Sequence, residues 1–345
     1  MSDDRHNLLE GIMLKKMFAV AAIMSVVCVG TAVAAEKTVE WKLSTIRPAG
    51  TSVDNDAKAF AATVKEKTNG RINIVIYPNS QLGDYQVVQE RISVGSVEMA
   101  IQPISTTVDR QMQLLNMPYL VKDWDTLKKN YLTGTPFMDW AAKRFEKQDI
   151  KLIGTWPVYF GGTALTKEPA SPGDPSVSKN MKVRVIPQKS FELLATSHGY
   201  LATPLPFAET FTALQTGIVD GAFGAGAEGY YSNFRDVLKF YVPSNTHVEQ
   251  WYVIINKEIW DGLSAGDRKV VEEAAKEMES NRIAKAPAET QEFEKKLNDY
   301  GVKVLPMTPE DLTRLAEAAR KLIIPEIRKT IGEKDFDEAM KFVVQ

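Results

Sequence analysis

The spacing of hydrophobic residues changes repeatedly between a period of two and a period near 3.6, which predicts alternating strands and helices. Residues 41–45 alternate as a strand, residues 52–68 carry apolar side chains at helical spacing, and residues 71–78 alternate again. A second helix is expected at about 85–94, followed by a short apolar strand at 98–102. This order predicts a mostly parallel sheet covered by helices.

The second half of the chain continues the pattern after a turn-rich segment at 167–175. The expected strands are 151–157, 181–187, 218–223 and 250–256, and the expected helices are 189–197 and 207–215. From Ser264 the chain is helical for about 35 residues, with Asp267 in the cap and Gly301 at the end. Such a helix spans roughly 50 Å, longer than one domain, so we expect it to bridge two lobes.

Strands of a parallel sheet end at one edge, and the loops at that edge form a ligand crevice. In the first half these loops are 46–50, 81–84 and 102–105. Arg47, Gln102 and Ser105 are therefore candidates to meet a ligand. Ordinary polarity of an exposed loop is the alternative for each of them.

Arg184 lies between two valines in a segment that otherwise has the pattern of a buried strand. A guanidinium keeps its charge, and its removal from water costs several kcal/mol unless an anion meets its donors. That anion is either an internal acid, with Glu209, Asp220 and Glu228 as candidates, or a ligand. The spacing leaves both possibilities open.

The first 34 residues have the pattern of a cleaved signal peptide, with a basic start, an apolar run at 19–30 and Ala-Val-Ala at 32–34. The apolar run is shorter than the roughly 20 residues that a membrane span needs. Cleavage would remove Cys28, the single cysteine, and with it any disulfide or zinc-thiolate site. A lipoprotein anchored at Cys28 is the alternative. We expect export to the periplasm.

The formal net charge of −2 argues against a nucleic-acid partner. Beyond residue 34 the histidines are His198 and His247, too far apart in sequence to suggest a metal centre. Motifs for a serine nucleophile, a P-loop or a dinucleotide do not occur where chemistry would need them. We therefore expect no cofactor, no metal and no enzymatic activity. The long helices near the end, rich in Lys, Glu and Ala, are expected to present solvated amphipathic faces, with surface recognition of a membrane partner as the alternative.

Three segments, 181–187, 204–221 and 253–260, resemble the solute-binding subunits of tripartite ATP-independent periplasmic (TRAP) transporters, the dicarboxylate-binding-protein-like family. The most specific part runs from Glu209 to Gly221, and the resemblance extends over essentially the whole chain after residue 34. It implies an α/β two-lobed periplasmic binding protein fold, with a mixed or mostly parallel sheet in each lobe, flanked by helices. It also implies that Arg184 binds the carboxylate of an organic acid as a bidentate pair.

Two departures from the family pattern concern the ligand. Many members have an asparagine where this chain has Gly224, and members that bind sialic-acid-like or dicarboxylate ligands often have a second arginine where this chain has residues 161–166. The resemblance therefore implies a ligand whose remote end is less charged or is met by other groups.

The expected lobes are 36–158 with 248–285, and 159–247 with 286–345, joined by hinge strands near 156–161 and 246–252. Aromatic residues at these crossings are candidates for the walls of the site, with core packing as the alternative. Glu209 could instead simply begin a helix. The complete set of expected ligand-binding residues is Arg184, Trp156, Tyr159, Phe223, Gln102, Ser105, Phe207, Glu209, Trp251 and Arg47.

These observations predict a periplasmic protein that captures a small organic anion, a carboxylate or a sulfonate, and delivers it to a TRAP membrane permease for ion-coupled uptake. One alternative is a ligand-sensing receptor read by a two-component kinase. A second is a periplasmic hydrolase or lyase that uses Glu209 and Asp220.

Overall fold

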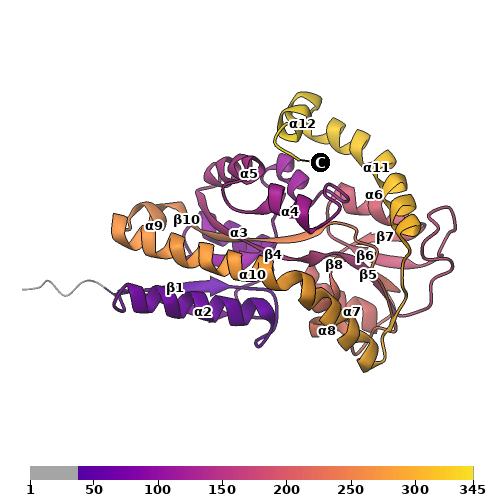
Figure 1. The fold of residues 1–345 in the computed structure, drawn as a ribbon, viewed down its shortest axis with the longest axis horizontal. Helices are drawn as coiled ribbons and strands as arrows, with labels where there is room; N and C mark the ends of the chain where they lie inside the picture. The colour runs from indigo at the N-terminus through magenta and orange to yellow at the C-terminus, as the bar shows by residue number, and fades with distance from the viewer. Residues whose placement is uncertain (1–37, 345) are drawn as a thin grey trace, which may run out of the picture. The chain divides into compact units, whose positions relative to one another are not determined.

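The computed structural model describes residues 38–344, and the predicted signal peptide lies outside the described residues. The described chain contains two sheets (Figure 1). The first has five strands in the order β2-β1-β3-β10-β4, and the second has six in the order β11-β9-β5-β8-β6-β7. The chain passes from the first sheet to the second and back, because β10 follows β9 but pairs with β3 and β4.

The first sheet is parallel on one side and antiparallel on the other. Its strands are β1 (Val39–Ser44), β2 (Ile72–Tyr77), β3 (Met99–Gln102), β4 (Ile150–Phe160) and β10 (Val248–Asn256). Strand β1 pairs in parallel with β2 and β3, and α2 (Ser52–Lys67) and α3 (Tyr85–Ser93) make the crossovers. Strand β10 is buried at every position because it lies between β3 and β4, as its uninterrupted apolar pattern predicts.

The second sheet is also mixed. Its strands are β5 (Gly162–Leu165), β6 (Lys182–Val185), β7 (Leu201–Pro204), β8 (Gly221–Ala225), β9 (Phe240–Val242) and β11 (Lys303–Val304). Strand β6 pairs in parallel with β7 and β8, whereas β5 is antiparallel to β8 and β9. The strand expected at 218–223 begins only at Gly221, and Ile218 lies exposed in the preceding turn. Between these strands lie α6 (Lys189–Ser197), the short 3-10 helix η2 (Phe207–Glu209), α7 (Thr210–Gln215) and α8 (Ala227–Phe234).

The two passages between the sheets are hydrogen-bonded to each other. Phe160 of β4 pairs with Val248 of β10. Just beyond, the Gly161 N–H donates to the His247 carbonyl and the Thr246 N–H donates to the Gly161 carbonyl, both at 2.8 Å. A Cβ at Gly161 would lie 2.2 Å from the His247 ring, so only glycine allows this close approach.

Helix α10 (Ala265–Tyr300) is 36 residues long and contacts elements of both sheets, which confirms the predicted bridging helix. It begins where the Ser264 side chain accepts a hydrogen bond from the Asp267 N–H, and it ends at Gly301 with φ of 100°. On the side of the first sheet it packs on α2 and β4, and on the side of the second it packs on α8 and β11. In Figure 1 it runs diagonally from α9 on the left to the vicinity of α8 at the lower right.

The remaining helices pack on strands of the first sheet or on other helices. They are η1 (Arg110–Asn116), α4 (Trp124–Tyr131), α5 (Pro136–Glu146), α9 (Lys257–Asp261), α11 (Pro309–Ile331) and α12 (Glu333–Met340). Helix α11 packs on α6, and the chain then returns to α4, where the side-chain amide of Asn130 makes two 2.7 Å hydrogen bonds with the backbone of Val344. The segment from residue 286 to the end thus contacts both α6, which lies beside the second sheet, and α4, which lies beside the first.

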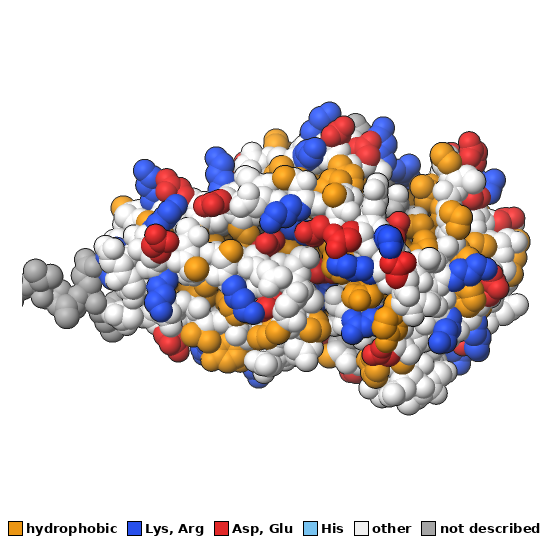
Figure 2. Space-filling view, turned by 60° about the horizontal axis from the view of Figure 1, so that its bottom comes forward, with side chains coloured by type: hydrophobic (Ala, Val, Ile, Leu, Met, Phe, Trp, Pro, Cys, Tyr) orange, Lys and Arg blue, Asp and Glu red, His pale blue; other side chains and the backbone are white. Residues whose placement is uncertain are grey.

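The surface carries charges of both signs. On the face shown in Figure 2, Lys and Arg side chains alternate with Asp and Glu, and no field of one sign dominates that face. Within residues 38–344, no helix has the length and apolar character needed to cross a membrane. In the same residues, no group of three His, Cys, Asp or Glu side chains is arranged to hold a metal ion.

Candidate functional site

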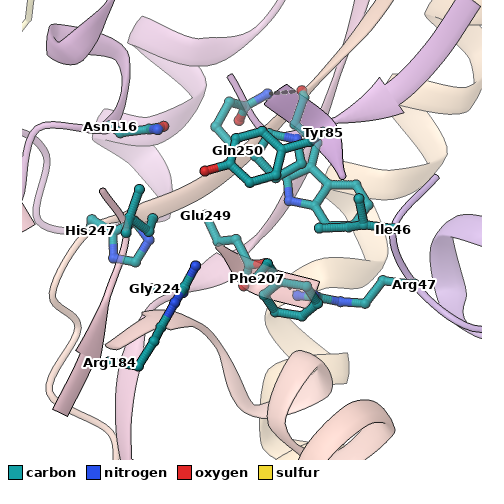
Figure 3. Close-up of a pocket in the computed structure, with 13 residues that line it drawn as sticks. Ile46, Arg47, Tyr85, Asn116, Arg184, Phe207, Gly224, His247, Glu249 and Gln250 are labelled. Atoms are coloured by element: carbon teal, nitrogen blue, oxygen red, sulfur yellow. Dashed lines mark hydrogen bonds and ion pairs between the residues drawn. The ribbon is translucent and has the colours of Figure 1, made fainter. Parts of the chain in front are cut away.

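A cavity lies where strand ends and loops of the two sheets face each other (Figure 3). Its empty volume, counted together with the open space at its mouth, is about 430 Å³. The first sheet contributes loops after β1 and β3 and the start of α3, and the second contributes β6, β8 and η2. Its lining residues are Ile46, Arg47, Tyr85, Pro103, Asn116, Arg184, Ile186, Phe207, Gly224, His247, Glu249, Gln250 and Trp251.

Arg184 is buried and points into this cavity from β6. Its Nε donates to the Leu205 carbonyl at 2.9 Å and its Nη1 donates to the Phe223 carbonyl at 3.1 Å. Burial lowers the pKa of Arg184 from its ordinary value, but a guanidinium remains a cation at neutral pH. These two bonds fix the plane of the group and leave its outer edge, the second Nη1 hydrogen and Nη2, for another partner.

The acids considered as internal partners of Arg184 are engaged elsewhere. Asp220 pairs with Lys167 at 2.7 Å, and Glu228 accepts from the Ser52 N–H at 3.1 Å. Glu209 is exposed and does not line the cavity. Among the described residues no carboxylate forms an ion pair with Arg184. The buried charge therefore has no internal counter-ion in that part of the chain.

Gly224 provides the space for the guanidinium. Its φ of 106° lies in the left-handed region, and an added Cβ would be 3.1 Å from Arg184 Nη1 and 2.8 Å from Ile186 Cγ1. The position at which many family members have asparagine is therefore too tight for a side chain here without movement of Arg184. Gly224 and Arg184 form one structural unit in this chain.

Arg47 enters the cavity from the opposite side and does have an internal partner. Its Nη2 lies 2.5 Å from Glu249 Oε1, while Glu249 Oε2 accepts from the Gly226 N–H at 2.6 Å. The guanidinium carbon lies 5.0 Å from the ring centroids of both Phe207 and Trp251, so the cation is held between two aromatic faces. Burial raises the pKa of Glu249, and the charge of Arg47 and the hydrogen bonds from Gly226 and Arg47 oppose that rise.

The other polar groups of the cavity are neutral. Burial raises the pKa of the Tyr85 phenol to about 12 and lowers the pKa of the His247 imidazole to about 3. His247 Nδ1 lies 2.9 Å from the Thr246 hydroxyl. The Tyr85 hydroxyl points into the cavity, toward Asn116 and His247. The cavity can therefore offer hydrogen bonds to the uncharged part of a ligand.

Four of the ten residues expected to bind a ligand line the cavity: Arg184, Arg47, Phe207 and Trp251. The other six do not line the cavity, but Gln102, Ser105 and Phe223 make hydrogen bonds close to it. Gln102 donates from Nε2 to the Tyr85 carbonyl at 2.8 Å, and the Ser105 N–H is bound by Gln89. Phe223 offers its carbonyl to Arg184, while its ring packs in the core against His198 and Tyr200.

The two aromatic residues of the first crossing, Trp156 and Tyr159, face α10 instead of the cavity. They lie beneath Arg282, whose guanidinium carbon is 4.3 Å and 4.8 Å from their ring centroids. Arg282 donates to the Pro157 and Val158 carbonyls at 2.7 and 2.8 Å and forms an ion pair with Glu289. The Glu289 carboxylate also accepts from the Tyr159 hydroxyl at 3.1 Å. We call these residues the Arg282 clamp; it holds α10 on the crossing strand.

The lining residues outside the ten expected ones are Ile46, Tyr85, Pro103, Asn116, Ile186, Gly224, His247, Glu249 and Gln250. Of these, Ile46 and Pro103 belong to loops that were predicted to form the crevice, and Gly224 is a position at which the chain departs from the family pattern. For Glu249 a signal existed, because a charged residue in an otherwise apolar strand raises the same question as Arg184. For Asn116, in η1, nothing in the local pattern pointed to the cavity.

Residues 43–328 match the family model described as bacterial extracellular solute-binding protein, family 7. The match covers most of the chain. The chain belongs to this family. Membership confirms the sequence-based predictions of a TRAP solute-binding protein, of a non-enzymatic role and of a periplasmic location.

Family 7 relatives support the same assignment at low identity. The chain is 24% identical over 296 residues to the C4-dicarboxylate-binding periplasmic protein DctP of Rhodobacter capsulatus, covering 85% of this chain and 86% of that protein. It is 25% identical over 284 residues to the sialic acid-binding periplasmic protein SiaP of Vibrio cholerae, covering 81% and 85%.

A solved structure shares the fold. A TRAP periplasmic solute-binding protein from Desulfovibrio salexigens with bound orotic acid superposes with a TM-score of 0.80 at 23% identity, covering 88% of this chain and 97% of that one. The likeness confirms the two-sheet binding-protein fold with its long bridging helix.

Proposed function

We propose that this family 7 protein captures a small organic acid in the cavity between its two sheets and delivers it to a TRAP membrane permease. The observation that carries the proposal is Arg184, a buried cation that faces the cavity and has no acidic partner among the described residues. A buried charge without a counter-ion is unfavourable, and a bound carboxylate would remove that penalty.

The contacts of Arg184 also suggest how the carboxylate binds. Since Nε is bonded to the Leu205 carbonyl, the side edge of the guanidinium is occupied. The outer edge can still make two parallel hydrogen bonds to the two oxygens of one carboxylate. This geometry favours a carboxylate over an anion that offers a single oxygen.

Closure of the two halves, which we treat as lobes around the two sheets, would complete the site. Contacts already join them: the Ala208 N–H donates to Asp84 Oδ2 at 3.2 Å, and the Ser52 N–H donates to Glu228. A ligand favours the closed form only through contacts that the open form lacks. Here those contacts would include Arg184 from one lobe and Tyr85 from the other.

The relatives support an acid as the ligand, since their names refer to C4-dicarboxylates and sialic acid and the solved structure holds orotic acid. All three are acids. Delivery to a permease rests on family membership alone. A receptor read by a sensor kinase would use the same cavity, and genes for TRAP membrane subunits beside this gene would favour transport.

The proposal is tested by a thermal-shift screen against a library of organic acids, followed by calorimetry, because a ligand of the folded state raises its melting temperature. Arg184→Met should reduce affinity by tens to thousands of fold, since one partner of a buried charge pair is typically worth about 2–5 kcal/mol. Arg320→Met is the control, because Arg320 also donates to a backbone carbonyl, that of Tyr119, but does not line the cavity. Near-native affinity in Arg184→Met, or no binding of any acid, would reject the proposal.

A further inference from the structure

The charges that line the cavity indicate which class of acid it binds. This inference rests on the proposed function. The charged residues of the lining are Arg47, Arg184 and Glu249. Arg47 and Glu249 pair at 2.5 Å and cancel each other. The net excess in the lining is one positive charge, on Arg184. A ligand with one negative charge balances it, whereas a second carboxylate would be buried without a cation of its own.

Arg47 cannot easily turn to serve a second carboxylate. Its guanidinium lies between Phe207 and Trp251, and Gly229 packs so close that a Cβ there would be 2.3 Å from Nη2. Release of Arg47 would leave Glu249 buried and unpaired. Figure 3 shows Arg47 and Arg184 reaching the cavity from different directions, with Glu249 and Phe207 between them.

The cavity lining also contains polar atoms without a hydrogen-bond partner, on residues that are almost fully buried. In the lining these atoms are Oε1 of Gln250, which is 1% exposed, the indole Nε1–H of Trp251, which is 0% exposed, and Nε of Arg47, which is 1% exposed. The orientation of the Gln250 amide is fixed, because its nitrogen donates to the Trp251 carbonyl at 3.0 Å. Oε1 of Gln250 is therefore a hydrogen-bond acceptor without a donor. Buried polar atoms are normally satisfied, so the unpaired atoms of Gln250 and Trp251 point to groups supplied by a ligand.

A hydroxyl group meets both needs, because it donates one hydrogen bond and accepts others. A methylene group meets neither, and a ketone cannot serve Gln250. We propose that the cavity selects hydroxylated monocarboxylates, with the carboxylate on Arg184 and a hydroxyl group near Gln250 and Trp251, and that it discriminates against dicarboxylates and unsubstituted acids.

Calorimetry at pH 7.5 with two matched sets of acids tests this proposal. The four-carbon set is 3-hydroxybutanoate, butanoate and succinate, and the six-carbon set is gluconate, hexanoate and glucarate. In at least one set the hydroxylated monocarboxylate should bind about tenfold tighter than its deoxy counterpart, because that counterpart leaves buried polar atoms unpaired. It should bind about a hundredfold tighter than the dicarboxylate.

Two variants separate the two parts of the proposal. Glu249→Gln removes the acid that neutralises Arg47, so it should shift the ratio of dicarboxylate to monocarboxylate affinity about tenfold toward the dicarboxylate. Gln250→Met removes the unpaired acceptor, so it should lower the ratio of hydroxylated to deoxy affinity about tenfold. Circular dichroism melts show which variants are folded. If a variant does not fold, the affinities of the wild-type protein for the two sets of acids still test the proposal.

The outcomes also separate this proposal from the proposed function. Equal or tighter binding of succinate or glucarate by the wild-type protein would overturn the charge argument while organic-acid binding still held. Equal binding of hydroxylated and deoxy acids would mean that water satisfies Gln250 and Trp251, and it would overturn the hydroxyl argument. Failure of every acid in the wider library would instead reject the proposed function.

Discussion

Arg184 and Arg282 are both buried arginines that donate to two backbone carbonyls and lie near aromatic rings, but they differ in their counter-ion. Arg282 pairs with Glu289 inside the protein, and among the described residues Arg184 pairs with no acid. Burial and aromatic neighbours are thus common to a structural clamp and a candidate binding site. The presence or absence of an internal carboxylate distinguishes them.

The environment of each arginine fits this difference. The Arg282 clamp is closed around its cation, since Trp156 and Tyr159 cover it and α10 supplies the acid. The cavity around Arg184 keeps unpaired polar atoms on neighbouring residues. These unpaired atoms lie on residues that share a cavity with the cation that lacks an internal carboxylate, so one ligand can satisfy both.

The largest expected effect comes from breaking the Arg282 clamp. Arg282→Met removes the cation from Glu289, whose side chain is 23% exposed. Breaking a buried ion pair costs about 3–5 kcal/mol, and the partial exposure of Glu289 places the loss near the lower end, about 3 kcal/mol of unfolding free energy. Urea unfolding measures it. Arg268→Met, in the same helix, is the control, because Arg268 donates to the Leu263 and Asp261 carbonyls at its surface end. If Arg282→Met lost no more unfolding free energy than Arg268→Met, the stabilising role of the Arg282 clamp would be contradicted.

Acidification should weaken the region of His247 before it affects the clamp. Burial lowers the pKa of His247 and of His198 to about 3, below the ordinary value of 6.5, so the unfolded chain binds more protons between these values. Stability is complete above pH 6.5 and falls toward pH 3, by about 1.4 kcal/mol per pH unit for each histidine. At pH 5 each histidine should therefore reduce the unfolding free energy by about 2 kcal/mol relative to its value above pH 6.5.

The variant His247→Gln should make the loss of unfolding free energy between pH 7 and pH 5 smaller by about the contribution of one histidine. The clamp responds only at lower pH: burial alone would raise the pKa of Glu289, but Arg282 and hydrogen bonds from Tyr159 and Ser52 hold it below its ordinary value. With Arg282 in place, the clamp should therefore contribute little to the slope between pH 7 and pH 5. An unchanged slope in His247→Gln would show that its imidazole is not held neutral.

The same substitution at the other arginine should have little effect on stability. Arg184→Met removes an unpaired buried charge but leaves two carbonyls without donors, and these terms nearly cancel. We expect the unfolding free energy without ligand to stay within about 1 kcal/mol of wild type. A loss as large as that of Arg282→Met would indicate that Arg184 has a structural role in place of a ligand.

The smallest effects distinguish the tyrosines of the two regions. Tyr159→Phe removes the hydrogen bond to Glu289 and should cost about 1 kcal/mol of stability without a change in ligand affinity. Tyr85→Phe removes a hydroxyl that points into the cavity and should reduce ligand affinity several-fold with little change in stability. Reversed results would mean that Tyr159 belongs to the binding site after all.

Much of the fold was predictable because its signals are local. The cap at Ser264 and the glycine at 301 define α10 to within a residue. The apolar run of β10 identified a central strand. Arg184 also stood out locally, as a charge between buried neighbours. Family resemblance then added its expected role.

The site as a whole was less predictable. Trp156 and Tyr159 looked like cavity walls because they lie at the crossing between sheets, yet their side chains face α10. The period of a strand shows that two faces exist, but not which face meets a ligand. Tyr85, Asn116 and His247 come from unrelated segments and meet only in the folded chain.

The sequence by itself determined the order of strands and helices, the long bridging helix and the presence of a cation in a buried strand, since all of these depend on residues close together in the chain. Only the tertiary structure decided that Arg47 is neutralised by Glu249, 202 residues away, that Arg282 has Glu289, and that Arg184 has no such partner among the described residues. The physical reason is that the energy of a buried charge depends on which distant groups folding brings within a few ångströms of it.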